Sequence, residues 1–397
     1  MPAGVTQLPK AQSRFWWAIG TVLALTLILR PPLAVIGPLL GNIRADLGLT
    51  VAQTGVLTAL PVLCFGAGAF AGPVLLRRFG LARTFSFILV LMTVTLASRA
   101  WLGFGYFLTA TVALGVGIAL SNVLFPTLIL AEFPGSVPRM TAVYTTLLSV
   151  FAALASGVAY PLSQAVGGWK PELTLLAIPG FIGFFIWRKT TSLDQSELEA
   201  APVAAAKLNL WGHPLAWALS AFFGLQSAIF YVLLNWLPSI LVAEGIAPTT
   251  AGVILAYLSS IGVPIGLILT ANLGRLNNLT TLLVAAISAV TASGLFLLLA
   301  GPAWVWVAAT LIGCGLSSSF PLSLALIGMK GGSQRATTSL SSIAQGIGYL
   351  VAAAAVFLAG VTGSGSSNWT PVIFALTGIA LIQGFAGSFA AKHVVIE

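Results

Sequence analysis

Apolar runs of about twenty residues follow one another along almost the whole chain, and each is long enough to cross a lipid bilayer. Hydrophobic residues make up 58% of the sequence and charged residues only 6%, whereas soluble domains carry about 25% charged residues. In the bilayer core every backbone polar group needs a partner inside the protein, and a helix supplies those partners within one segment. The sequence therefore predicts an all-α integral membrane protein.

The apolar runs, divided at their glycine, proline and charged breaks, predict twelve transmembrane helices. The longest polar interruption, residues 188–212, separates six spans from six. Two equal groups joined by a linker are typical of transporters built from parallel repeats. We expect an N-terminal six-helix half over residues 1–187, a cytoplasmic linker over 188–212 and a pseudo-symmetric C-terminal six-helix half over 213–397.

The net charge of +9 reflects membrane orientation in this interpretation. With the N-terminus inside, thirteen basic residues fall in cytoplasmic segments, and the outer segments hold only Arg44, Arg99 and Lys170. This positive-inside asymmetry predicts that both termini are cytoplasmic. The expected partners are the lipid bilayer and a small-molecule substrate that is anionic, with no nucleic acid, and the protein is expected to be a monomer.

Arg30 interrupts the first apolar run about 20 Å beyond Trp16, close to the middle of a span. A guanidinium there costs at least about 2.5 kcal/mol on insertion scales. Pro31 and Pro32 follow, and they disfavour regular helix at Arg30. The structural alternative is an arginine that snorkels or neutralises a carboxylate. We favour a cation at a helix break that faces the protein interior or a water-filled cavity.

Acidic residues are absent from the predicted mid-membrane region, because all eight fall in predicted loops or at span ends: Asp46, Glu132, Glu172, Asp194, Glu197, Glu199, Glu244 and Glu397. Proton-coupled transporters commonly use buried acids or histidines. The sequence therefore favours facilitated diffusion, exchange or a proton carried by the substrate, with a titrating Glu132 as the alternative. An Arg30 without a carboxylate partner predicts an anion site for carboxylate, cyanate or nitro oxygens.

Other residues near mid-span are candidates to complete the cavity. Gln345 and Tyr349 are four apart and share a helix face, as do Gln226 and Phe230, which could stack on a substrate. Interhelical hydrogen bonding is the alternative role for each polar side chain. We expect Gln226 or Gln345 to reach the substrate. The predicted substrate-binding set is Arg30, Asn122, Tyr144, Gln226, Phe230, Tyr231, Gln345 and Tyr349.

Six segments spread over nearly the whole chain resemble one family: LRPPLAVIGPLL from Leu29, TGVLTALPVLCFG from Thr54, NVLFPTLILAEFP from Asn122, MTAVYT from Met140, FGLQSAIFYVLLNWLP from Phe223 and SSIAQGIGYLVAA from Ser341. With the six-plus-six plan they resemble the major facilitator superfamily, in its cyanate and 2-nitroimidazole transporter branch. The resemblance implies the fold of that superfamily and a place in a bacterial cytoplasmic (inner) membrane.

The chain departs from the wider superfamily at two places. Arg77 stands where the loop between spans two and three usually carries an aspartate, and Thr111 stands where the fourth span often carries a buried arginine. Closure on the cytoplasmic side must then use other contacts, for example Arg78 or Arg83 with helix C-terminal carbonyls. The predicted gating residues are Arg77, Arg78, Arg83 and Glu132.

The expected function is secondary transport of a small anion or polar organic solute, cyanate-like or carboxylate-like, by alternating access with Arg30 as the central recognition residue. One alternative is a carrier of drugs or nitroimidazoles, which are neutral heteroaromatics, and another is a membrane receptor that has lost transport. No enzyme is expected, because Walker, zinc-site and nucleophile-elbow patterns do not occur. No cofactor or metal is expected.

Overall fold

The computed structural model describes residues 8–133, 136–191, 210–272, 279–366 and 368–392. These residues are almost entirely helical, which confirms the predicted all-α fold. The α-helices are α1 Leu8–Leu29, α2 Pro31–Ala34, α3 Ile36–Leu47, α4 Val51–Ser98, α5 Gly103–Glu132, α6 Val137–Ala165, α7 Trp169–Leu175, α8 Ala177–Thr191, α9 Pro214–Ala243, α10 Pro248–Asn272, α11 Thr280–Leu297, α12 Val305–Lys330, α13 Gln334–Ser366 and α14 Thr370–Lys392. Two short 3-10 helices, η3 Leu298–Ala300 and η4 Pro302–Trp304, join α11 to α12.

The twelve predicted spans are present among the described residues. Eleven helical segments are long and apolar enough to cross a membrane, and the shorter apolar helix Ala82–Ser98 is the twelfth. That helix is the second part of α4, which reverses direction at Gly80, where φ is 73°. Side chains other than glycine rarely adopt this left-handed conformation, so glycine allows a sharp turn between spans two and three.

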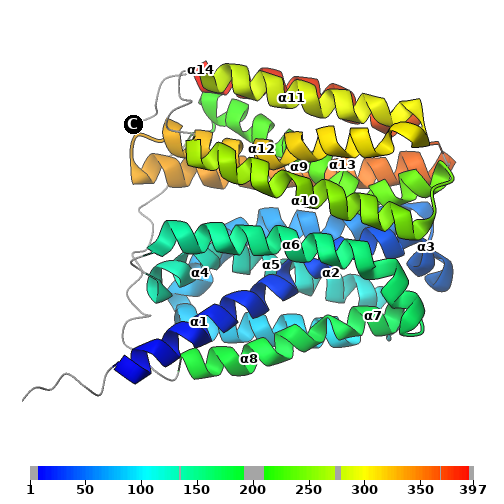
Figure 1. Ribbon diagram of the computed structural model, residues 1–397. Coiled ribbons are helices and arrows are strands. Elements are labelled where there is room, and N and C mark those ends of the chain that lie inside the picture. The colour runs from blue at the N-terminus through cyan, green and yellow to red at the C-terminus, as the bar shows by residue number, and fades with distance from the viewer. Residues whose placement is uncertain (1–7, 134–135, 192–209, 273–278, 367, 393–397) are drawn as a thin grey trace, which may run out of the picture.

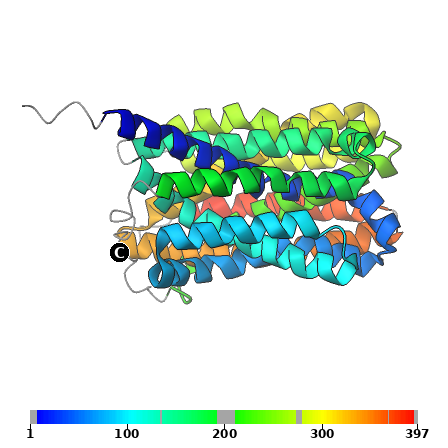
Figure 2. The same ribbon diagram turned by 90° about the horizontal axis from the view of Figure 1, so that it is seen from below.

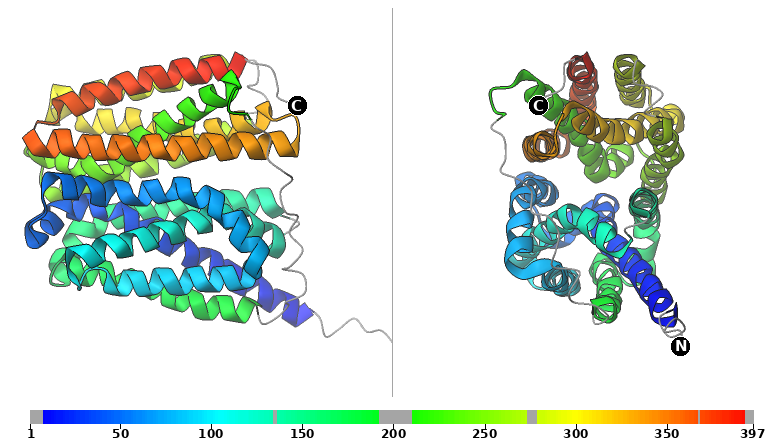
Figure 3. Two further views of the ribbon diagram at one scale, coloured as in Figure 1. Left: turned by 180° about the vertical axis from the view of Figure 1, so that it is seen from behind. Right: turned by 90° about the vertical axis from the view of Figure 1, so that its left-hand side faces the viewer.

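The helices form two groups that lie side by side, α1–α8 in one half and α9–α14 in the other (Figure 1). The end view in Figure 3 shows both groups along the helix axes. Figure 2 shows α1 running obliquely to the other helices of the first half. Helices α1 and α14 begin and end, respectively, at the same end of the bundle, which we call the terminal end. The opposite end, where α3 ends and α10 begins, is the distal end.

Glycines let the two halves approach closely near the distal end. A β-carbon on Gly37 of α3 would lie 2.5 Å from the Leu234 carbonyl oxygen of α9. A β-carbon on Gly252 of α10 would lie 2.8 Å from the Ser156 carbonyl oxygen of α6. Small residues permit this backbone approach, which a larger side chain would prevent. Both contacts lie in the distal parts of their helices, so the halves are packed together at that end.

Helices α4 and α13 continue this contact toward the middle of the bundle. A β-carbon on Gly55 of α4 would lie 3.2 Å from the Phe357 ring of α13, and one on Gly66 would lie 3.2 Å from the Gly346 carbonyl oxygen. Val51 begins α4 at the distal end, so Gly66 lies about 22 Å along the helix from that end. The packed interface between the halves therefore extends from the distal end to about mid-membrane depth.

Candidate functional site

Arg30 lies at a break in the first span, as its two following prolines predict. Helix α1 ends at Leu29 and α2 begins at Pro31, with Arg30 between them. Its carbonyl oxygen accepts hydrogen bonds from the backbone N–H groups of Leu33 and Ala34, both at 3.1 Å. Leu29 and Pro31 are buried, whereas Arg30 keeps accessible surface. The break thus places a cation with free surface inside an otherwise buried segment.

Aromatic side chains surround the Arg30 guanidinium. Its central carbon lies 5.8 Å from the centre of the Phe230 ring, within the range of a cation–π contact. The Tyr231 hydroxyl is within hydrogen-bonding reach, and the Tyr144 and Tyr349 hydroxyls are close enough to interact electrostatically with the charge. Arg30 and Tyr144 come from the first half, and Phe230, Tyr231 and Tyr349 come from the second. The group therefore lies between the halves, where carriers of this architecture bind substrate.

Ring contacts join these tyrosines to two further phenylalanines. Phe65 of α4 lies 5.8 Å from Tyr231 and 5.5 Å from Tyr349, measured between ring centres. Phe230 lies 5.1 Å from Tyr231, and Phe223 lies 5.2 Å from Tyr349. All four pairs are tilted or edge-to-face, the geometries that aromatic pairs favour. We call Phe65, Phe223, Phe230, Tyr231 and Tyr349 the aromatic cluster.

Tyr144 brings an unused hydroxyl to this site. Its ring stacks on Phe125 of α5, with ring centres 3.6 Å apart and an angle of 13° between planes. The residue is buried, and its hydroxyl has no hydrogen-bond partner among the described residues. An unsatisfied buried polar group costs about 1 to 3 kcal/mol. A substrate oxygen near Arg30 would remove that cost by accepting the hydroxyl hydrogen.

Arg30 has no carboxylate partner within the part of the chain that the structure describes, and no acid is among the groups that interact with its charge. An ion pair that does form, Lys170 with Asp46 at 2.8 Å, lies at the distal end between α7 and α3. A cation without an acidic partner, set within an otherwise buried segment, favours an anionic ligand. The anion site predicted from the sequence stays a prediction.

The two glutamines are engaged with neighbouring serines. The Gln226 amide, which is buried, donates to the Ser227 hydroxyl at 2.7 Å. The Gln345 amide, which is partly exposed, donates to the Ser341 hydroxyl at 2.7 Å. Each amide nitrogen has two hydrogens, so each keeps one donor for another partner. Their predicted contact with substrate stays a prediction.

Within the described residues, no contact joins the remaining predicted residues to this group. Asn122 is exposed on α5, and its role in binding stays a prediction. Arg78 is exposed, with its guanidinium 5.4 Å from the Phe79 ring centre, and Arg83 is exposed as well. Glu132 is half-buried at the end of α5, and the side chain of Arg77 lies outside the described residues. The gating roles of these four residues stay predictions.

Two charged residues near the distal end are buried. Arg99, which the sequence predicts in an outer segment, follows the last residue of α4 and is 1% exposed. Glu172, which the sequence predicts in a loop or at a span end, lies near the start of its span and is 2% exposed. The reason is tertiary: the segment after α4 packs on α5, with the Arg99 guanidinium 5.8 Å from the Phe107 ring. Apolar runs locate the ends of spans and carry no signal for how far a connecting segment folds inward.

Comparisons with known proteins find relatives along nearly the whole chain. The model of the Major Facilitator Superfamily matches residues 22–356. The Uncharacterized transporter YycB of Bacillus subtilis (strain 168) is 33% identical over 382 residues, covering 95% of this chain and 94% of that protein. The 2-nitroimidazole transporter of Escherichia coli (strain K12) is 32% identical over 386 residues, covering 96% of each. The Cyanate transport protein CynX of the same organism is 28% identical over 345 residues, covering 86% of this chain and 88% of that protein.

Solved structures share the fold at low sequence identity. A bacterial homolog of the human lysosomal transporter Spinster, in an inward-facing and occupied conformation, superposes with a TM-score of 0.75 at 14% identity, covering 95% of this chain and 96% of that one. The D-xylose-proton symporter gives a TM-score of 0.73 at 14% identity, covering 95% and 97%. At this identity both structures show the fold alone.

Proposed function

The chain belongs to the Major Facilitator Superfamily, and we propose that it carries a small anion or polar organic solute, cyanate-like or carboxylate-like, with Arg30 as the central recognition residue. It is a multi-pass membrane protein of a transporter family. A carboxylate or a cyanate ion fits the planar guanidinium, which can donate two parallel hydrogen bonds to neighbouring oxygens or to an electron-rich end atom.

The observation that carries the proposal is that two neighbouring polar groups between the halves each lack a suitable partner in the described part of the chain. Arg30 lacks a carboxylate among the described residues, and the buried Tyr144 hydroxyl lacks an acceptor. An anion placed beside the guanidinium would satisfy both groups. The Phe230 and Tyr231 rings would lie beside it and exclude water, which strengthens each charge-assisted bond.

The way the two halves pack also favours a substrate site at Arg30 that is reached by alternating access. The close contacts at Gly37 and Gly252 pack the halves together at the distal end, while Arg30 lies at the break in the first span. The positive-inside distribution assigns the terminal end to the cytoplasm. We infer an inward-facing arrangement, in which the substrate site communicates with the cytoplasm and rocking of the halves exposes it to the outside.

A second candidate substrate is a neutral nitroheteroaromatic compound. The aromatic cluster favours it, because Phe65, Phe230 and Tyr231 offer edges and faces to a flat ring, and the nitro oxygens can accept from Arg30. A relative that is 32% identical is named a 2-nitroimidazole transporter. The two candidates differ in charge, so uniport of the anion moves net charge across the membrane and uniport of the neutral compound does not.

The experiment is a binding and uptake screen with purified protein in proteoliposomes, using cyanate, small carboxylates and 2-nitroimidazole. Uptake of an anion that generates a membrane potential supports the first candidate. Electrically silent uptake of 2-nitroimidazole alone supports the second. Absence of binding and uptake for every compound, by protein that remains folded, contradicts both and favours the receptor alternative.

A further inference from the structure

Arg99 is a second buried guanidinium, and the site around Arg30 does not account for it. It follows the last residue of α4 and is 1% exposed, so it does not reach out to the membrane surface. Its Nη2 donates to the Pro32 carbonyl oxygen at 3.5 Å, the long limit of a hydrogen bond. Its Nε has no partner among the described residues. Its guanidinium carbon lies 5.8 Å from the centre of the Phe107 ring, and this contact does not supply an anionic partner.

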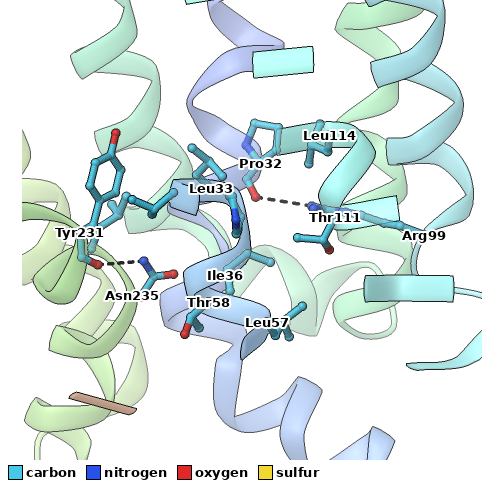
Figure 4. Close-up of a pocket in the computed structure, with 13 residues that line it drawn as sticks. Pro32, Leu33, Ile36, Leu57, Thr58, Arg99, Thr111, Leu114, Tyr231 and Asn235 are labelled. Atoms are coloured by element: carbon cyan, nitrogen blue, oxygen red, sulfur yellow. Dashed lines mark hydrogen bonds between the residues drawn. The ribbon is translucent and has the colours of Figure 1, made fainter. Parts of the chain in front are cut away.

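The Arg99 side chain lines a cavity of about 20 Å³ between the halves. Figure 4 shows Arg99 reaching toward the Pro32 carbonyl with Thr111 beside it, while Asn235 lies across the cavity, next to Tyr231. Asn235 and Tyr231 belong to α9 of the second half, and the other three residues belong to the first. A cavity of this size holds one small polar species. Most of the lining is apolar, and the polar side chains in it are Thr58, Arg99, Thr111, Tyr231 and Asn235.

The donors in this cavity fit an anion. Asn235 uses one amide hydrogen on the Tyr231 carbonyl oxygen, at 2.8 Å, and keeps the second. The Thr111 hydroxyl donates to the Phe107 carbonyl at 2.6 Å, and it can rotate to donate to a stronger acceptor. Arg99 keeps its Nε hydrogen. Carboxylates are absent from the lining. Three residues that can donate hydrogen bonds, one of them positively charged, thus line the same cavity.

We propose that Arg99, Asn235 and Thr111 form a second anion site that takes one small monovalent anion, of the size of a halide or cyanate. The site lies on the distal side of Arg30, and Tyr231 connects the two: it contacts Arg30 and lines the Arg99 cavity. The anion is either a resident halide or the transported anion on its path. The identification of the anion as the transported one rests on the proposed function. The anion site itself does not.

The site also joins the two halves. Arg99 and Thr111 belong to the first half and Asn235 to the second, so a bound anion bridges them where the distal contacts close. An anion that binds only this arrangement shifts the conformational population toward it. Occupancy at Arg99 therefore favours the state with the distal end closed.

The test is anomalous diffraction from crystals of the full-length protein soaked in sodium bromide. We expect a bromide peak within about 3.5 Å of the Arg99 Nε. The Arg99→Gln protein should lose it. The Arg44→Gln protein should keep it, since Arg44 does not line the cavity. The Arg30→Ala protein should keep it too, so failure of the proposed function at Arg30 does not obscure this result. A cavity without bromide in the unaltered protein overturns the proposal, as does a peak that survives Arg99→Gln.

Affinity is measured by thermal shift in the Arg30→Ala protein. The melting temperature in sodium chloride, bromide or cyanate is compared with that in sodium gluconate, an anion too large for the cavity. Arg99→Gln should weaken the halide effect by about tenfold or more, the loss expected for a charge-assisted contact. If that variant does not fold, Asn235→Leu should weaken it instead. Equal shifts in gluconate and bromide contradict the proposal. Displacement of bromide by cyanate indicates the transported anion, and displacement by chloride alone indicates a resident halide.

Discussion

Arg30 and Phe230 belong to different halves, and the Arg30 guanidinium carbon lies 5.8 Å from the centre of the Phe230 ring. The contact joins the break in the first span to the seventh span. Any rocking of one half against the other changes this distance, so the pair is placed to couple occupancy of the site to movement of the halves.

Replacing Phe230 with leucine should weaken substrate binding about three-fold to tenfold, because the cation–π contact and one wall of the site are lost together. Phe230→Tyr keeps the ring and should bind nearly as the unaltered protein does. Affinity is measured by competition in detergent solution. Equal affinities in the leucine and tyrosine variants would remove Phe230 from the site.

A disulfide across the distal interface should stop transport. A β-carbon on Gly157 of α6 would lie 3.1 Å from the Ala256 β-carbon of α10, near the separation that a disulfide needs. Gly157→Cys with Ala256→Cys, made after replacing Cys64 and Cys314 by alanine, should cross-link under oxidation and lose uptake. Reductant should restore it. Gly157→Cys alone is the control, and full uptake by completely cross-linked protein would contradict alternating access through this interface.

Transport of a permanently charged anion should not require a proton gradient. Glu132, which is half-buried, and Glu172, which is buried, are the acids to examine. Glu132→Gln and Glu172→Gln should each leave uptake within about two-fold of the unaltered rate, because neither acid interacts with the Arg30 charge. Accumulation driven by a proton gradient alone, and lost in either variant, would show that this mechanism is wrong.

The Lys170–Asp46 ion pair should add little to stability at neutral pH. The Lys170 ammonium, 2.8 Å away, lowers the pKa of Asp46 below its usual value. This contribution is complete above the unfolded pKa of about 3.9 and is lost as pH falls through the lower folded pKa. Because both side chains are at least a third exposed, Lys170→Gln should cost less than about 1 kcal/mol. Melting temperatures from pH 5 to 8 should differ by a constant small amount, and the difference should shrink below pH 4. A difference that grows on acidification would contradict this assignment.

The membrane fold follows from the sequence because apolar length and the placement of breaks are local properties. Pro31 and Pro32 remove backbone donors, so the break at Arg30 was predictable without any knowledge of neighbouring helices. Tyr231, Phe230 and Tyr349 were predicted near the site because their positions are near mid-span, and the structure places them around Arg30.

Tertiary packing decides what the sequence could not show. Phe65 and Phe223 complete the aromatic cluster, yet their spans contain many similar apolar residues. The burial of Arg99 depends on how the segment after α4 meets α5 and the first span. Apolar periodicity gives the face of a helix and does not identify which neighbour that face meets.

The measurement that tests the central claim most directly is substrate affinity in Arg30 variants, using the compound that the screen identifies. Arg30→Ala should lose at least about tenfold in affinity, and Arg30→Lys should lose part of it, since lysine keeps the charge without the planar fork. Arg44→Gln, outside the site, should bind as the unaltered protein does. Unchanged affinity and uptake in folded Arg30→Ala protein would contradict the assignment of Arg30 as the recognition residue.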